Sequence, residues 1–210
     1  MNLENLIPAE RIRYNEPMQD HTTFRIGGPA DIMVMPESVP EIMRVLEWVR
    51  KRDLPYLVIG EGSNLLVKDG GIRGVVIKLG PGFSRVEFRG TEVEAQAGVK
   101  VSRLAALAAD RGLSGLEFAE GIPGSLGGAV YMNAGAYGGE MSQIIKEVTV
   151  ISESGEITVL EKPALEFGYR TSSIQKKGYI VLAAKLVLHP DESQLIWQRM
   201  DELSRQRREK

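Results

Sequence analysis

The hydrophobic and polar positions of the chain follow two different periods, which predicts a protein of mixed helices and strands. Short apolar runs between turn residues predict strands, at residues 23–26, 30–35, 56–59, 65–67, 74–78, 86–88, 93–97, 148–151, 157–160 and 179–188. Apolar residues at helical spacing predict helices, at residues 38–52, 101–111 and 192–210. The strands at 148–151 and 157–160 are expected to form a hairpin, because turn residues lie between them.

Two of the predicted helices have recognisable ends. Ser38 and Glu41 have the spacing of a capping box, and the helix that they begin carries Val39, Ile42, Met43, Leu46 and Val49 at helical spacing. The last helix is predicted to place its apolar residues on one side, Leu195, Ile196 and Leu203. Its basic end is interpreted as the usual cations of a last helical turn rather than as a nucleic-acid-binding patch.

A glycine-rich segment between Glu120 and Gly139 interrupts this regular pattern. It contains seven glycines and almost no charge, although a quarter of the whole chain is charged. Glycine is expected where a Cβ does not fit or where φ is positive. One interpretation is therefore a main chain pressed against a flat, charged ligand, and the other is a packing turn inside the fold.

A second glycine loop, Gly60-Glu61-Gly62-Ser63-Asn64, follows the predicted strand at 56–59. It is not a dinucleotide fingerprint, because Leu65 replaces the third glycine and the next residues are strand-like rather than helical. The chain also lacks the Gly-x-x-x-x-Gly-Lys-Ser/Thr of a P-loop. Two interpretations stay open, an anion-binding nest of backbone N–H groups and a plain hairpin turn.

Composition and charge narrow the classes of function. The net charge of −2 gives no overall field for nucleic acid or an anionic membrane, and 43% hydrophobic residues suffice for a core. The chain has no cysteine, and its two histidines, His21 and His189, lie far apart, so no disulfide, thiolate chemistry or metal site is expected. No apolar run approaches the ~20 residues of a membrane span, and the N-terminus does not resemble a signal peptide. A cytoplasmic protein is expected.

Four segments in a fixed order carry a resemblance to a known family. Their sequences are HTTFRIGG at residues 21–28, IGEGSNLLV at 59–67, GIPGSLGG with MNAGAYG at 121–128 and 132–138, and GYR at 168–170. Together they resemble the UDP-N-acetylenolpyruvoylglucosamine reductases, flavoenzymes of bacterial peptidoglycan synthesis. The resemblance implies an α+β fold, the FAD-binding fold of the vanillyl-alcohol-oxidase (PCMH) type with two subdomains.

The resemblance also implies a reaction and a set of site residues. NADPH would pass a hydride to FAD, which would reduce the enolpyruvyl ether of the UDP-sugar substrate to the lactyl ether of UDP-N-acetylmuramate. Arg170 matches the catalytic arginine, which would hold the substrate carboxylate, and Asn133 and Tyr169 would join it in binding the substrate. FAD would be held by residues of the two glycine loops and of the long strand, namely Gly60, Glu61, Gly62, Ser63, Asn64, Leu65, Gly121, Ile122, Pro123, Gly124, Ser125, Gly128, Gly135 and Val181.

Two further expectations concern single loop residues. The side chain of Glu61 is expected to point to solvent, because a carboxylate beside a pyrophosphate is repulsive. Gly62 and Gly124 are expected to tolerate no large side chain, because the cofactor would occupy that space.

The expected organisation has three parts, with residues 1–80 and 81–190 as FAD-binding subdomains and 191–210 as a helix leading to a third, absent domain. In the family that domain supplies a serine that protonates the substrate carbon and a glutamate that acts with Arg170. No serine of this chain has the glycine-rich setting of that motif. We therefore expect the 210-residue chain to bind FAD without completing the reaction.

Two other functions stay open on the sequence alone. One is an FAD-binding module without catalysis of its own, and the other is a different oxidase of the same fold. A covalently attached flavin would need His21, because the chain has no cysteine and His21 is the only plausible histidine. The sequence does not determine the oligomeric state.

Overall fold

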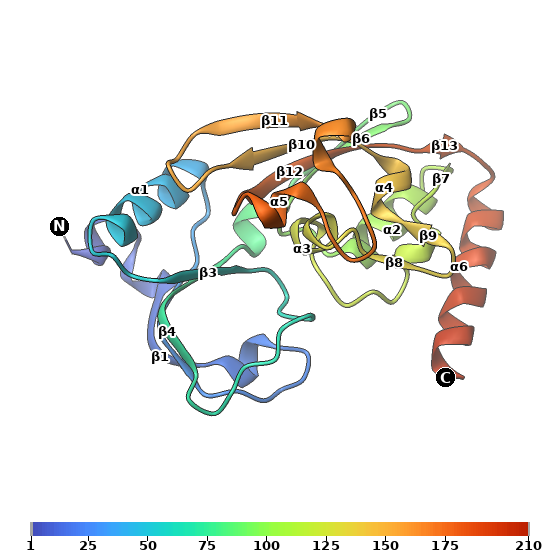
Figure 1. Cartoon of the computed structure of the whole chain (residues 1–210). Coiled ribbons are helices and arrows are strands. Elements are labelled where there is room, and N and C mark those ends of the chain that lie inside the picture. Colours follow the sequence, from blue (N-terminus) through green and yellow to red (C-terminus); the bar gives the residue numbers. More distant parts are fainter. Residues whose placement is uncertain (1, 210) are drawn as a thin grey trace.

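Two β-sheets that share one hydrophobic core form the centre of the computed structural model, which describes residues 2–209 (Figure 1). The first sheet has the order β1-β2-β4-β3, with strands Ile12–Pro17 (β1), Pro29–Val34 (β2), Tyr56–Ile59 (β3) and Ile72–Lys78 (β4). The second has the order β11-β10-β12-β6-β5, with strands Val86–Arg89 (β5), Glu92–Gln96 (β6), Ile145–Ile151 (β10), Ile157–Glu161 (β11) and Ile180–Val187 (β12). Two small ladders pair Leu113–Ser114 (β7) with His189–Pro190 (β13), and Gly135–Ala136 (β8) with Gly139–Glu140 (β9).

Helices of very different length connect and cover these strands. They are Val39–Arg50 (α1), Val101–Ala109 (α2), Leu126–Tyr131 (α3), Met141–Ile144 (α4), Ser173–Lys176 (α5) and Ser193–Arg208 (α6). Short 3₁₀ helices lie at Leu3–Asn5 (η1), Ala9–Arg11 (η2), Met18–His21 (η3), Pro81–Phe83 (η4), Glu117–Ala119 (η5) and Lys162–Leu165 (η6). No helix within residues 2–209 combines the length and apolar character that crossing a bilayer requires.

The central strand of the first sheet, β4, is buried on both faces. Val75 and Ile77 face the main core, whereas Val76 faces a smaller cluster on the opposite side of the sheet. Both neighbours of β4, β2 and β3, run parallel to it, which explains why its apolar residues form a continuous run instead of alternating with polar ones. The carboxyl ends of these three strands therefore meet at one edge of the sheet.

A hairpin of the second sheet reaches over α1 and ties the two sheets together. Figure 1 shows β10 and β11 passing above this helix, and the guanidinium of Arg50 donates a hydrogen bond to the carbonyl of Glu153 in the hairpin turn at 3.2 Å. Buried residues of α1, including Ile42 and Val49, belong to the same core as the second sheet. Because the core is shared, the subdomain boundaries at residues 80 and 190 stay a prediction.

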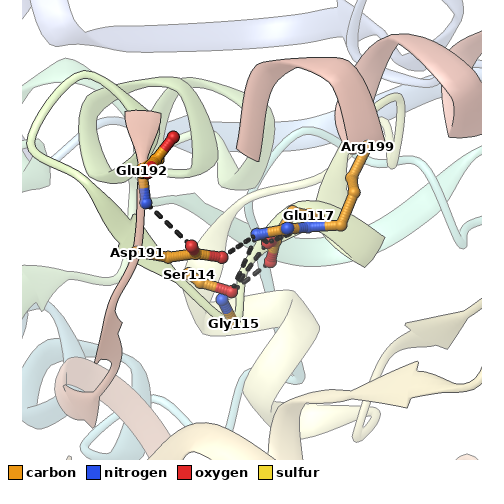
Figure 2. A network of polar contacts seen from close by, with 6 residues as sticks. All are labelled: Ser114, Gly115, Glu117, Asp191, Glu192 and Arg199. Carbon is orange, nitrogen blue, oxygen red and sulfur yellow. Dashed lines mark hydrogen bonds and ion pairs between the residues drawn. The ribbon is translucent and has the colours of Figure 1, made fainter. Parts of the chain in front are cut away.

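The long helix α6 is anchored by a polar network at its first turns (Figure 2). Arg199 Nη2 lies 2.8 Å from Glu117 Oε1 and 2.6 Å from Asp191 Oδ2, and it also donates to the hydroxyl of Ser114 at 3.3 Å. The backbone N–H of Gly115 donates to the second oxygen of Glu117 at 2.7 Å. The network thus fixes α6 to η5 and β7, segments that are far away in the sequence.

Most of the predicted elements are confirmed. Strands form close to all but two of the predicted ranges, all three predicted helices are present, and β10 and β11 form the expected hairpin. The last helix differs in its buried side, since Ile196 and Met200 are buried, whereas Leu195 is 42% exposed. Positions four residues apart lie on one face of a helix, whereas neighbours diverge, so the core selects one of the two adjacent apolar residues.

Four details of the sequence-based prediction are wrong. Residues 23–26 are not a strand, because Arg25 has a φ of +52° and its N–H bonds back to Thr22. Residues 65–67 are part of a loop, and the strand β1 was not predicted from its polar sequence. At α1 the Ser38 hydroxyl does accept from the N–H of Glu41, but the Glu41 carboxylate accepts from Glu37 N and binds Arg11, so the reciprocal half of the capping box is absent.

Candidate cofactor site and substrate pocket

The loop Gly60–Leu65 leaves the carboxyl end of β3 and does not form a hairpin. Because β3 and β4 are parallel neighbours, residues 60–71 must cross from one end of the sheet to the other, which excludes the interpretation as a plain hairpin turn. Ligands of α/β sheets bind outside the carboxyl ends of the strands. The loop is therefore placed where such a ligand would lie.

The polar hydrogens of this loop are free. Across residues 2–209, no hydrogen bond to another residue is donated by any backbone N–H of residues 60–65, nor by the side chains of Ser63 and Asn64. On the facing loop, the backbone N–H groups of Ser125 and Gly128 are free in the same sense. Clustered N–H groups of this kind bind anions, so the two loops offer donors suited to a pyrophosphate.

The two glycine loops press directly against each other. A Cβ on Gly60 would lie 2.0 Å from Ser125 Oγ, and a Cβ on Gly124 would lie 3.2 Å from Ser63 Oγ. The expectation for Gly62 is wrong in its cause, since a Cβ there would lie 2.0 Å from the carbonyl oxygen of His21 and the residue has a φ of +64°. Gly62 is therefore needed by the neighbouring backbone rather than by a cofactor.

Two adjoining cavities, of about 540 and 340 Å³, run along this contact between the sheets. Both are lined by Gly60, Ser125, Gly128 and Tyr131. The larger cavity includes the predicted loop residues Gly60, Glu61, Gly62, Ser63, Asn64, Leu65, Ile122, Pro123, Gly124, Ser125 and Gly128 and extends to Arg170. The smaller cavity continues between the beginnings of β3 and β12, where Tyr56, Tyr179 and Val181 line it.

The space beside Gly128 tests whether the cavity can hold a group the size of FAD. A Cβ on Gly128 would have Ser125 Oγ as its nearest neighbour, at 3.7 Å, and would otherwise project into open space. The position is helical, so the absence of a side chain keeps the cavity open rather than relieving backbone strain. An elongated, partly apolar cavity with free donors at its middle suits a dinucleotide.

The charge on the loop is compensated by Lys100, the residue directly before α2. The carboxylate of Glu61 lies 3.5 Å from Lys100 Nζ, and 36% of the Glu61 side chain remains exposed. The expectation that Glu61 turns to solvent is thus met only in part, because Lys100 neutralises it. At the far end of the smaller cavity, burial and the charge of Glu153 raise the pKa of the Tyr56 hydroxyl, which keeps it a hydrogen-bond donor.

Arg170 occupies the third position of a tight turn at the end of the larger cavity. Gly168 and Thr171 exchange two backbone hydrogen bonds, at 3.1 and 3.3 Å, and Arg170 between them has a φ of +55°. Its guanidinium donates to the carbonyl of Gly135 at 3.3 Å. The neighbouring ring of Tyr169 is 90% exposed.

The predicted substrate residues come together around a further pocket of about 290 Å³, which shares Arg170 with the larger cavity. It is lined by Asn133, Gly135, Tyr169 and Arg170, together with residues of the β8–β9 hairpin. Among the predicted residues, Gly121 lies apart from these cavities, since a Cβ there would meet the side chain of Arg207 in α6 at 3.0 Å. The structure therefore brings most of the predicted site into one continuous groove.

Sequence reasoning missed several residues of this groove. Lys100 and the rings of Tyr56, Tyr131 and Tyr179 were not proposed as site residues, because each belongs to an ordinary helix or strand pattern. Lys100 ends the strand-to-helix connection before α2, and only the fold brings it to the one acid of the glycine loop, Glu61. Within residues 2–209, no group of three or more His, Asp or Glu side chains is arranged to hold a metal ion.

Comparison with known proteins gives consistent matches. Residues 30–161 match the family described as FAD binding domain. A protein named UDP-N-acetylenolpyruvoylglucosamine reductase from Syntrophomonas wolfei is 48% identical over 206 residues, which cover 98% of this chain and 69% of that protein. A protein of the same name from Clostridium tetani is 49% identical over 209 residues, covering 100% of this chain and 68% of that protein.

Solved structures agree with the sequence comparison. The crystal structure of UDP-N-acetylenolpyruvylglucosamine reductase from Thermus caldophilus has a TM-score of 0.81 and 37% identity, and covers 92% of this chain and 68% of that one. The BBE-like 1 protein of Physcomitrella patens has a TM-score of 0.68 at 16% identity, covering 90% of this chain and 45% of that one, and so shows the fold alone. The α+β fold of the vanillyl-alcohol-oxidase type is confirmed.

Proposed function

The chain belongs to the family of UDP-N-acetylenolpyruvoylglucosamine reductases, and we propose that the groove between its sheets is where the reaction of this family takes place. The function is the FAD-dependent reduction of UDP-N-acetylenolpyruvoylglucosamine, with NADPH as the hydride donor, in peptidoglycan precursor synthesis. One observation carries the proposal: the free N–H groups of Gly60–Leu65 and the residue Arg170 line the same cavity.

The free N–H groups near Gly60 and Ser125 would hold the pyrophosphate of FAD at the middle of the groove. The isoalloxazine would then lie toward Arg170, and the adenosine would enter the smaller cavity lined by Tyr56, Tyr179 and Val181. Uncharged N–H donors suit the binding of the pyrophosphate, since Lys100 already compensates the carboxylate of Glu61, the one acid of the loop. When bound, FAD would supply the redox chemistry, the transfer of a hydride from NADPH to the enolpyruvyl group, which with one proton would give UDP-N-acetylmuramate and NADP⁺.

Arg170 would act on the substrate carboxylate. Addition of a hydride to the carbon–carbon double bond moves negative charge toward the attached carboxylate, and a guanidinium stabilises that charge with paired hydrogen bonds. The guanidinium of Arg170 donates one hydrogen bond to the carbonyl of Gly135. Asn133 and Tyr169 line the same pocket, where the rest of the enolpyruvyl ether would lie.

The reaction also requires a residue that protonates the substrate carbon. Within the described part of the chain, the pocket of about 290 Å³ beside Arg170 has no serine among its lining residues. We therefore propose that the 210-residue chain accepts hydride from NADPH but forms no measurable UDP-N-acetylmuramate. A cytoplasmic location fits a reaction that uses NADPH and a UDP-sugar.

The proposal is tested with the FAD-reconstituted chain. Its visible absorbance should show bound flavin, anaerobic NADPH should bleach it, and acid should release the flavin intact because the attachment is noncovalent. Arg170→Ala should leave FAD affinity unchanged within about twofold. In any form of the protein that turns over, the same substitution should lower the rate of substrate reduction by ~10²–10³, the usual effect of losing a charge-stabilising donor.

A matched control is Arg13→Ala. Arg13 is also exposed and also spends one donor on a backbone carbonyl, that of Ile12 at 3.4 Å. It should leave every property unchanged. A chain that stays colourless after FAD titration would refute the proposal, and flavin loss in Arg170→Ala alone would make that arginine structural.

A further inference from the structure

Both ends of the Asn133 side-chain amide are hydrogen-bonded to the protein's own backbone. Its Nδ2 donates to the carbonyl of Gly168 at 3.1 Å, and its Oδ1 accepts from the backbone N–H of Ser142 at 2.9 Å. Asn133 is only 3% exposed and has a φ of +43°, a backbone conformation that asparagine tolerates better than most residues. Both ends of its amide therefore join two loops that approach the pocket from opposite sides.

One of these loops is the turn that presents Arg170. The carbonyl of Gly168 accepts from the N–H of Thr171 as well as from Asn133, so the asparagine completes the hydrogen bonding of the turn. A second tie comes from Gln175, whose amide donates to the carbonyls of Tyr131 at 2.7 Å and Arg170 at 3.3 Å. Within residues 2–209 the turn belongs to neither of the two large sheets, so side-chain ties of this kind connect it to the neighbouring segments.

The other loop contains the carbonyl to which the Arg170 guanidinium donates. Ser142 is the second residue of α4, which follows the β8–β9 hairpin, and Gly135 in β8 accepts the hydrogen bond of the guanidinium. Asn133 thus fixes the backbone of the arginine through Gly168, and it fixes the carbonyl that receives the arginine through Ser142. A shift of either loop would change the position of the positive charge.

We propose that Asn133 is a positioning residue for Arg170 and does not itself bind the substrate. The role assigned to Arg170 rests on the proposed function, but the hydrogen bonds of Asn133 to Gly168 and Ser142 do not depend on it. One N–H and the oxygen of the amide are bound to Gly168 and Ser142, and the residue is only 3% exposed, which leaves little of it available to a substrate. Its function is to lock the turn at 168–171 in the conformation that places the guanidinium at the cavity.

The test is hydrogen exchange at Thr171 N–H, compared between variants of the whole chain with and without FAD. Asn133→Ala removes both hydrogen bonds, and Asn133→Asp removes only the donor to Gly168 while keeping shape and tolerance of a positive φ. Each should lower the protection factor of Thr171 about tenfold, the usual effect of losing one buried hydrogen bond. FAD affinity should stay within about twofold, because the bonds lost are to Gly168 and Ser142 rather than to the cofactor loop.

The aspartate variant adds a pH profile that tests whether the hydrogen bond to Gly168 is what protects Thr171. At neutral pH the introduced carboxylate faces the carbonyl of Gly168 without a proton to share. Protonation restores a donor, so the protection of Thr171 should return as the pH falls through the pKa of the introduced carboxyl group. The charged or titratable groups that line the same pocket are Arg170, Glu140, Tyr137 and Tyr169, and their contribution is removed by comparison with the parent at each pH.

Ser173→Ala is the matched control. Ser173 is fully buried and its hydroxyl donates to the carbonyl of Ala164 at 2.7 Å, away from the turn. It should lower overall stability without a selective loss at Thr171. Unchanged protection of Thr171 in both Asn133 variants would overturn the proposal, and so would an equal loss of protection at Thr171 and in β12. If no FAD binds, the proposed function fails, while the exchange result still decides the role of Asn133.

Discussion

Gly60 and Ser125 stand so close that a Cβ on Gly60 would lie 2.0 Å from the Ser125 hydroxyl oxygen and 2.9 Å from its Cβ. The two residues belong to different glycine loops and line both adjoining cavities. Their contact therefore sets the distance between the loops that would hold the FAD pyrophosphate. A side chain at position 60 would force these loops apart.

Gly60→Ala is expected to weaken FAD binding by about tenfold or more, because loop geometry within an ångström governs such contacts. Its φ lies outside the left-handed region, so strain of the backbone is not the cause. Ser125→Gly in the same chain removes the clashing atoms and should recover part of the affinity, measured by flavin fluorescence titration. Additive losses in the double variant would show that the two positions do not communicate.

Gly128→Leu separates cofactor binding from stability. A leucine at this helical position would fill the open space of the cavity, so FAD affinity should fall by at least about 100-fold, a loss typical of blocking a pocket with a whole side chain. The unloaded chain should hold or raise its Tm, because replacing glycine in a helix gains up to about 1 kcal/mol.

Gly62→Ala provides the contrast to this variant. The clash with the His21 carbonyl at 2.0 Å and the φ of +64° should lower the Tm of the unloaded chain as well. If Gly128→Leu bound FAD like the parent, the cavity above α3 would not be the cofactor site.

Lys100 should support FAD binding through charge rather than contact. Lys100→Met leaves the Glu61 carboxylate uncompensated beside the pyrophosphate, and we expect affinity to fall roughly three- to tenfold at low salt and less at high salt. Glu61→Gln combined with Lys100→Met should restore it. Titrations at two ionic strengths measure the effect, and a salt-independent loss would point to a direct contact of Lys100 with the cofactor.

The anchoring of α6 should depend on acid pH. Burial alone would raise the pKa of Glu117, but hydrogen bonds from Gly115, Ser114 and Arg199 outweigh it and hold that pKa below its usual value of 4.5. Arg199 likewise lowers the pKa of Asp191 from its usual value of 3.8. At pH values above its usual pKa, each carboxylate therefore contributes its full stabilisation of the fold. This contribution disappears as the pH falls through the lowered pKa of that carboxylate.

Arg199→Met should lower the Tm by roughly 2–4 °C at pH 7, which corresponds to about 1 kcal/mol for a partly exposed network in a chain of this size. The difference from the parent should shrink as the pH falls below about 4, because protonated carboxyls gain little from the guanidinium. Arg205→Met removes an exposed ion pair with Glu202 in the same helix and serves as the control. A Tm difference independent of pH would show that packing of the Arg199 side chain, rather than charge, holds the helix.

The sequence by itself determined the kinds of element and the chemistry of the site. The apolar patterns at 38–52 and 148–151 indicate a helix and a strand, a property that each segment carries locally. The order of the glycine motifs and of Gly168-Tyr169-Arg170 indicated the family, and with it FAD and the role of Arg170. Motifs that follow one another in the order typical of a family indicate that family without any knowledge of how the chain packs.

Only the tertiary structure decided which distant residues meet. The parallel pairing of β3 and β4 turned an apparent hairpin loop into a crossing whose N–H groups are free. Gly62 faces the carbonyl of His21, Glu61 meets Lys100, and Asn133 binds Gly168. No local pattern encodes these contacts, because each depends on how two segments far apart in the chain are packed against the same core.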